Sequence, residues 1–323
     1  MNLTVTASPH IRGRESTGRI MRDVLIALVP ALAAGTWAYG PRALLLTAVT
    51  VLACLASEGL FRVLTRQHNT LADGSAAVTG VLLAMTLPAI APYWLAALGG
   101  VFAVVAVKGL CGGLGQNIFN PALAARAFLL MLWPSWLVRF AAPGAELPLL
   151  GSAAEAATSA TPLHHMQMPA LPETPLLDLF LGNVAGCIGE ASALALLLGG
   201  VYLVARKVIS PRIPVAYLGS VALLTLAFSK GENPLQWMLY SLFGGGVMLG
   251  AIFMATDYAT SPATPRGQLL YGVGCGVLTV LFRYNGLFPG GVTYAILLMN
   301  AAVWLIDRYT APRRFGAVKG GAA

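Results

Sequence analysis

Residues 24–39 read VLIALVPALAAGTWAY, and a second apolar run, PRALLLTAVTVLACLASEGL at residues 41–60, follows after a single glycine. Each run is close to the roughly 20 residues that a helix needs to cross the hydrocarbon core of a bilayer. Basic residues precede the first run, as in a signal peptide, but further long apolar runs follow it at once. We therefore expect the first run to be a membrane span and not a cleaved leader.

The composition of the whole chain supports a membrane protein. Of its 323 residues, 57% are hydrophobic and only 10% are charged, whereas soluble domains contain about 25% charged residues. The formal net charge is +8, but the basic residues lie in short clusters without interleaved aromatic residues, which argues against a nucleic-acid partner. The four cysteines show no C-x-x-C spacing, so the sequence predicts neither a disulfide framework nor a metal site.

The apolar runs predict an all-α polytopic membrane protein with about ten transmembrane helices. The third and seventh runs are short, and such helices can be half-buried inside a bundle where irregular backbone is tolerated. The predicted spans are residues 22–40, 43–64, 76–91, 93–110, 122–141, 184–205, 214–229, 236–256, 267–283 and 291–307.

The basic residues predict the orientation of these spans. If residues 1–21 and the tail, residues 308–323, are both cytoplasmic, nearly all of the 20 Lys and Arg residues fall on the inner side. That distribution follows the positive-inside rule. The exceptions, on the outer side, are Arg42, Arg139, Lys230 and Arg283.

One long connection, residues 142–183, contains no Lys or Arg and is predicted to lie outside. It separates residues 22–141 from residues 184–307, and each part holds five predicted spans. Because five is odd, the two halves would have opposite orientations, as in inverted-repeat transporters. The likeness of GVLLAM at residues 80–85 to GVMLGA at residues 246–251 is compatible with common descent or with chance.

This connection also contains the stretch EAATSATPL at residues 155–163. Its pattern, acid-x-x-Ser/Thr-x-Ala-Thr, is similar to the flavinylation motif of the D and G subunits of Rnf ion-translocating electron-transport complexes. Glu155 and Ser159 depart from the Asp and Gly usual there. Further blocks resemble the D subunit in the same order along the chain: SPHIR at 8–12, DGSA at 73–76, GGLGQNIFNPA at 112–122, FMATDYATSPATPRGQ at 253–268 and YAILLMN at 294–300.

The resemblance implies a covalent cofactor. FMN would be joined by a phosphodiester to the hydroxyl of Thr161, with Thr158, Ser159 and Ala160 completing the motif that a flavin transferase recognises. It also implies a place in a bacterial inner-membrane complex with the Rnf A, B, C, E and G subunits, with the flavin loop in the periplasm. That complex relays electrons between ferredoxin and NAD and couples the relay to movement of Na⁺ or H⁺. The unmodified Ser/Thr-rich loop is the alternative for this stretch.

A second set of polar residues lies in the loops after the fourth and eighth spans. Three glycines in the Gly112 block permit close approach of backbone to a ligand, and Asn117 and Asn120 offer amide donors and acceptors. We expect them to face Thr256 and Asp257 across the two halves in one polar pocket. The resemblance implies that this pocket holds a riboflavin without a covalent bond, and a simple tight turn at the Gly112 block is the alternative.

Other functional classes share parts of this sequence pattern. Inverted repeats with broken helices also occur in small-solute channels and secondary transporters, which is the main alternative. A haem bundle is disfavoured because all four histidines fall in predicted loops. Among acids near the spans, Asp257 is the first candidate for an ion or flavin contact, while Glu58 has Arg62 four residues away as a possible partner.

Overall fold

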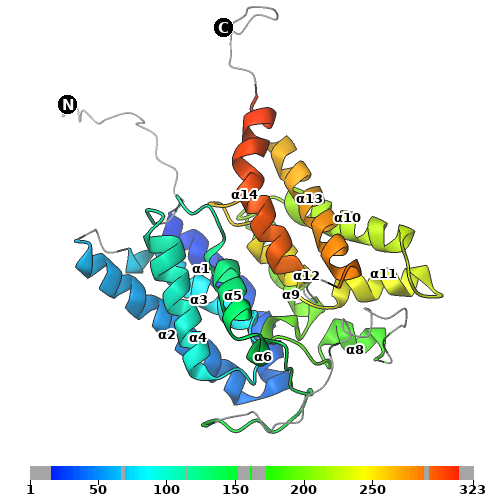
Figure 1. Ribbon diagram of the computed structural model, residues 1–323, viewed down its shortest axis with the longest axis horizontal. Helices are drawn as coiled ribbons and strands as arrows, with labels where there is room; N and C mark the ends of the chain where they lie inside the picture. Colours follow the sequence, from blue (N-terminus) through cyan, green and yellow to red (C-terminus); the bar gives the residue numbers. More distant parts are fainter. Residues whose placement is uncertain are drawn as a thin grey trace, which may run out of the picture.

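The computed structural model describes residues 16–66, 70–113, 115–151, 161, 172, 174–286 and 291–312. The regular elements of these residues are helices, and an isolated bridge pairs Pro88 with Cys187. The helices form one bundle (Figure 1). The predicted all-α class is thus confirmed for the part of the chain that the structure describes.

The helices of the first predicted half are α1 (Thr17–Tyr39), α2 (Pro41–Leu64), η1 (Leu71–Asp73), α3 (Ser75–Met85), α4 (Tyr93–Phe102), η2 (Ala103–Gly109), α5 (Pro121–Leu132) and α6 (Pro134–Leu137). Those that follow are α8 (Leu176–Leu181), η3 (Ile188–Glu190), α9 (Ala193–Ala205), α10 (Arg212–Ala227), α11 (Pro234–Phe243), α12 (Val247–Leu249), η4 (Gly250–Met254), α13 (Pro265–Tyr284) and α14 (Val292–Thr310). Each predicted span coincides with one or more of these helices.

Two of the described helices, α1 with 23 residues and α2 with 24, are long and apolar enough to cross a membrane without interruption. A third span results if α11 is joined to α12 and η4, although these two parts are bent by 62°. The remaining helices are shorter or less apolar, so length and composition alone identify two to three spans in the described chain.

Several helices begin where the sequence supplies a side-chain cap. The oxygen of a cap residue accepts from a free N–H of the first turn, and a proline placed next costs nothing because its missing N–H would have no helical partner. Three helices combine both signals, in the pairs Asn120-Pro121, Asn233-Pro234 and Thr264-Pro265. The polar loops therefore end at defined residues.

Four spans that the sequence predicted as continuous helices are broken. Residues 86–92 follow α3 without a helix, Trp133 separates α5 from α6, residues 182–192 carry only η3 before α9, and residues 244–246 separate α11 from α12. The expectation of helix throughout residues 76–91, 122–141, 184–205 and 236–256 is therefore wrong.

Three of these breaks meet inside the bundle. Ile188 N donates to Leu87 O at 3.1 Å, and a Cβ on Gly189 would lie 2.7 Å from Met85. A Cβ on Gly246 would lie 3.1 Å from Glu190 Oε1.

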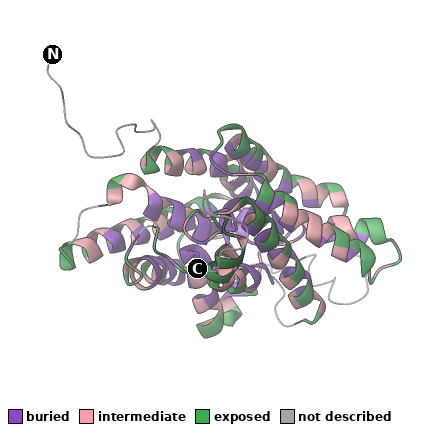
Figure 2. Cartoon of the chain, turned by 90° about the horizontal axis from the view of Figure 1, so that it is seen from above, coloured by how far each residue is buried: buried purple, intermediate pink, exposed green. Residues whose placement is uncertain are grey.

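The largest apolar core joins both predicted halves. It includes Leu28 and Leu83 from the first half and Tyr217 and Phe253 from the second, all buried. Seen from above, buried residues occupy the middle of the bundle and exposed ones lie at its rim (Figure 2). Many of the rim residues are large and apolar, such as Trp37, which is 93% exposed, as expected of a surface that faces lipid.

Candidate functional site

The two polar loops singled out in the sequence line one cavity. Its polar residues include Asn117 and Asn120 from the loop before α5, and Thr256 and Asp257 from the loop after η4. The remainder of its wall is mainly apolar: Ile20, Met21, Val24, Val78, Leu82, Leu203, Val208, Ile209 and Phe253. The predicted meeting of the loops is confirmed, while flavin binding by them stays a prediction.

Asn120 ties the two loops together. Its Oδ1 caps α5 by accepting from Ala122 N at 3.1 Å and Leu123 N at 3.2 Å. Its Nδ2 donates to Met254 O at 3.3 Å, across to the other predicted half. This side chain is 3% exposed, so the cap also fixes one wall of the cavity.

Asn117 is the polar side chain of this cavity with an unsatisfied atom. It is buried, and its Oδ1 has no hydrogen-bond partner among the described residues. A buried acceptor without a partner costs about 1–3 kcal/mol unless a ligand or water satisfies it. Asn117 is therefore placed to accept a hydrogen bond from a molecule bound in the cavity.

Thr256 and Asp257 occupy the opposite wall. The hydroxyl of Thr256 donates to Ile252 O of η4 at 2.7 Å. The Asp257 carboxylate accepts from Ala259 N at 3.4 Å and from Thr260 Oγ1 at 3.2 Å, which shapes the loop after η4. Asp257 remains partly exposed and lines the cavity, so its charge is available to a ligand there.

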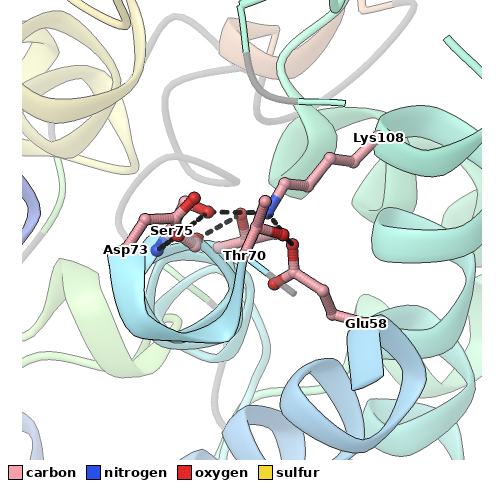
Figure 3. Close-up of polar contacts among 6 residues, drawn as sticks. Glu58, Thr70, Asp73, Ser75 and Lys108 are labelled. Atoms are coloured by element: carbon pink, nitrogen blue, oxygen red, sulfur yellow. Dashed lines mark hydrogen bonds and ion pairs between the residues drawn. The ribbon is translucent and has the colours of Figure 1, made fainter. Parts of the chain in front are cut away.

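A buried lysine also lines the cavity, and sequence analysis did not single it out (Figure 3). Lys108 Nζ donates to Glu58 Oε1 at 2.7 Å and to Ser75 Oγ at 2.6 Å. Ser75 Oγ in turn donates to Asp73 Oδ1 at 2.5 Å, and Thr70 Oγ1 donates to Glu58 Oε1 at 2.7 Å. The cluster places an ion pair, each partner 2% exposed, against the cavity wall.

The partner of Glu58 was predicted differently. Spacing on one helix suggested Arg62, but the ion pair that Glu58 makes in the structure is with Lys108, from η2. Sequence spacing reports neighbours on the same helix only. The one available signal was that Lys108 is a basic residue within a predicted span, where charged residues usually have an assigned role.

Thr161 is described by the structure as a partly exposed residue outside any helix. The other three predicted motif residues, Thr158, Ser159 and Ala160, lie outside the described residues. Thr161 thus retains some exposure, and the attachment of FMN there stays a prediction.

The beginning of the long connection is anchored to the bundle. Arg42, fully buried at the start of α2, donates through Nη1 to Pro148 O at 2.6 Å and to Gly151 O at 3.3 Å. The hydroxyl of Tyr93 donates to Leu149 O at 2.5 Å. Residues 148–151, which precede the EAATSATPL stretch, are thus held against the first predicted half.

Comparison with known proteins agrees with the resemblance seen in the sequence. Residues 4–316 match the model of the NQR2, RnfD, RnfE family. The chain is 48% identical to the D subunit of the Na(+)-translocating ferredoxin:NAD(+) oxidoreductase complex of Acetobacterium woodii, over 99% of this chain and 97% of that protein.

Two further relatives are similar over nearly their whole length. The D subunit of the proton-translocating ferredoxin:NAD(+) oxidoreductase complex of Clostridium ljungdahlii is 39% identical, over 97% of this chain and 96% of that protein. The D subunit of the ion-translocating oxidoreductase complex of Stutzerimonas stutzeri is 40% identical, over 94% of this chain and 93% of that protein. The chain therefore belongs to the NQR2, RnfD, RnfE family.

Proposed function

We propose that this chain is the D subunit of an Rnf complex, a membrane translocase that couples electron transfer between ferredoxin and NAD to movement of Na⁺ or H⁺. The observation that carries the proposal is the near full-length similarity to D subunits that are named for this reaction in other organisms. Its partners would be the Rnf A, B, C, E and G subunits in a bacterial inner membrane. No complete activity is expected of this chain alone.

The proposed topology is ten spans in two inverted halves, with both termini cytoplasmic and the long connection periplasmic. The distribution of basic residues supports it, as does the presence of a helix in each predicted span. In this arrangement the cavity lined by Asn117 and Asp257 faces the cytoplasm. Arg42 and residues 148–151, near the beginning of the long connection, face the periplasm.

We propose Thr161 as the attachment point of a covalent FMN, which would be installed by a separate flavin transferase. The motif around it and the partial exposure of its side chain support the assignment. The anchoring of residues 148–151 by Arg42 and Tyr93 would keep the attachment site near the bundle. When bound, a flavin accepts and donates electrons one or two at a time.

The cavity between the two loops is proposed to hold a noncovalent flavin such as riboflavin. The residues present fit such a group: the unsatisfied Asn117 Oδ1 is matched by the N–H of a flavin pyrimidine ring, and the apolar wall suits the hydrocarbon edge of that ring. The Lys108 ammonium lines the same wall, with its charge balanced by Glu58 at 2.7 Å. Asn120 would keep the two loops at a fixed separation through its bond to Met254.

The cavity would have to widen to admit a ring. About 70 Å³ of it accepts the centre of a water-sized sphere, whereas sites for drug-sized ligands run to roughly 300–1,000 Å³. Tyr258, which is exposed, and Met21, which is partly exposed, are the wall residues whose displacement would widen it. The buried residues Asn117, Asn120 and Thr256 would stay in place.

The experiment is intact mass and in-gel flavin fluorescence of the purified chain, co-expressed with a flavin transferase, beside Thr161→Ala. Wild type should carry one FMN less one water, and the variant should lose both the added mass and the in-gel fluorescence. Ser152→Ala is the control, because it removes a hydroxyl in the same connection but outside the motif, and it should keep the flavin. If wild type stays unmodified although the transferase modifies another substrate, the channel or transporter alternative is favoured.

A further inference from the structure

A second, smaller cavity lies where three of the broken spans meet. Its wall includes Thr86 from the break after α3, Glu190 from η3 and Gly246 from the break before α12, together with Arg126 of α5 and Thr293 of α14. It offers about 20 Å³ to the centre of a water-sized sphere, and one water molecule needs roughly 10–15 Å³ on that measure. The space is therefore sufficient for a single water.

Two opposite charges face this cavity without touching. Arg126 Nη1 donates to Thr86 O and to Cys187 Sγ, the latter at 3.4 Å. Glu190 Oε2 accepts from Cys187 N at 3.3 Å. The ion pairs of the described chain are Lys108–Glu58 and Arg206–Asp23, so Arg126 and Glu190 share the cavity with no direct ion pair between them.

We propose that one water molecule bridges Arg126 and Glu190, and that this hydrated pair bars cations from passing between the two predicted halves. Charged groups at membrane depth are costly unless they are paired or hydrated. One bridging water can accept from Arg126 and donate to Glu190 at the same time. A fixed guanidinium in a narrow passage repels protons and metal cations. Arg126, on the first half, would supply that barrier, and Glu190, on the second, would balance its charge.

The position of the pair supports a barrier. Asn120 lines the larger cavity and donates to the carbonyl of Met254, whose residue lines the smaller one. A cation that passed this shared wall from the larger cavity would meet Arg126 in the smaller one. A leak at this point would dissipate any ion gradient that the protein helps to build.

Removing the positive charge should turn the barrier into a cation site. In Arg126→Gln the Glu190 carboxylate and the freed Thr86 carbonyl face the same small space, and oxygen atoms of these two kinds are ligands for hard cations. The proposal needs the chain to sit in a membrane, and it does not depend on a flavin.

The test is the passive leak of H⁺ and Na⁺ into liposomes that contain the assembled complex, without electron donors. Arg126→Gln should raise the leak about tenfold or more, since it removes the charge that opposes cation entry. The double variant Arg126→Gln, Glu190→Gln should return to near the wild-type leak. Arg206→Gln, which removes an arginine that lines neither cavity and whose side chain is 51% exposed, should leave the leak unchanged.

Two outcomes would overturn the proposal. One is an assembled Arg126→Gln complex as tight as wild type. The other is an equal leak in the single and double variants, which would mean that lost packing and not lost charge opened the path. If Arg126→Gln fails to assemble, a density map of the wild-type complex that resolves ordered water decides: one peak within hydrogen-bond distance of both side chains supports the bridge, and a direct ion pair or an empty cavity refutes it.

Discussion

At the scale of single residues, three arginines of this protein donate to backbone carbonyls at the breaks. Arg42 Nε donates to Ala89 O at 3.0 Å, Arg126 donates to Thr86 O, and Arg283 donates to Ser241 O at 2.6 Å and Gly244 O at 3.0 Å. Unwound backbone at membrane depth needs such donors because no water replaces them. The guanidinium group, with five N–H donors in a fixed plane, serves several carbonyls at once.

The buried pair Lys108–Glu58 leads to a stability prediction. Lys108→Met should lower the free energy of unfolding by about 3–5 kcal/mol, because it leaves a buried carboxylate without its partner. Replacing both residues, as Lys108→Met with Glu58→Met, should recover most of the loss. Denaturant-induced unfolding of the purified chain in detergent measures both.

Arg206→Met provides the matched control for that experiment. Arg206 also forms an ion pair, with Asp23 at 3.2 Å, but its side chain is 51% exposed. Exposed pairs contribute only about 0–1 kcal/mol. If Arg206→Met destabilised the chain as strongly as Lys108→Met, burial of the Lys108 pair would not be the cause.

At the scale of elements, the sequence predicted which stretches are helical but not where four of the predicted spans break. Hydropathy averages over many residues, so the apolar runs at 76–91 and 184–205 looked continuous. The breaks depend on donors far along the chain: Arg42 is 47 residues from Ala89, and Arg283 is 42 from Ser241. No local pattern shows such pairs. A capped start, by contrast, depends on local sequence alone, because the cap and the first helical residue are neighbours in Asn120-Pro121.

Substitutions of Asn120 can separate its two roles, which are to cap α5 and to link the two loops. Asn120→Ala should lower the free energy of unfolding by about 1 kcal/mol for the lost cap and by a further amount of about 1 kcal/mol for the lost bond to Met254. Asn120→Ser keeps a capping oxygen and loses the bond, so it should fall between Ala and wild type. Denaturant unfolding in detergent measures the series, and equal effects of Ala and Ser would contradict a capping role.

At the scale of the whole molecule, the two predicted halves are joined by close helix packing. A Cβ on Gly199 of α9 would collide with the carbonyl oxygen of Ala27 on α1 and lie 2.9 Å from Phe253. Small residues allow helices in a membrane to approach in this way. The order of the motifs along the chain predicted the family, but this contact between α1 and α9 could not be predicted, because it depends on how the halves dock.

Gly199→Ala should therefore destabilise the chain by about 1–3 kcal/mol through overpacking. Gly219→Ala is the matched control: Gly219 lies within helix α10, and a Cβ there has no neighbour within 4 Å. This second change should be neutral or stabilising by up to about 1 kcal/mol, since alanine favours a helix over glycine. Thermal unfolding in detergent compares the two variants. Equal destabilisation would show that overpacking between α1 and α9 is not the cause of the loss in Gly199→Ala.

The larger cavity also bears on the electrical work done across the membrane. A space that admits water and reaches the surface near Tyr258 carries the electrical potential of the solution outside it. The membrane voltage then falls over the remaining thickness, beyond Met254, and the field there is correspondingly steep. Moving one elementary charge through that short interval would involve nearly the full work, about 2.3 kcal/mol per 100 mV, so Arg126 and Glu190 would lie where the voltage acts most strongly.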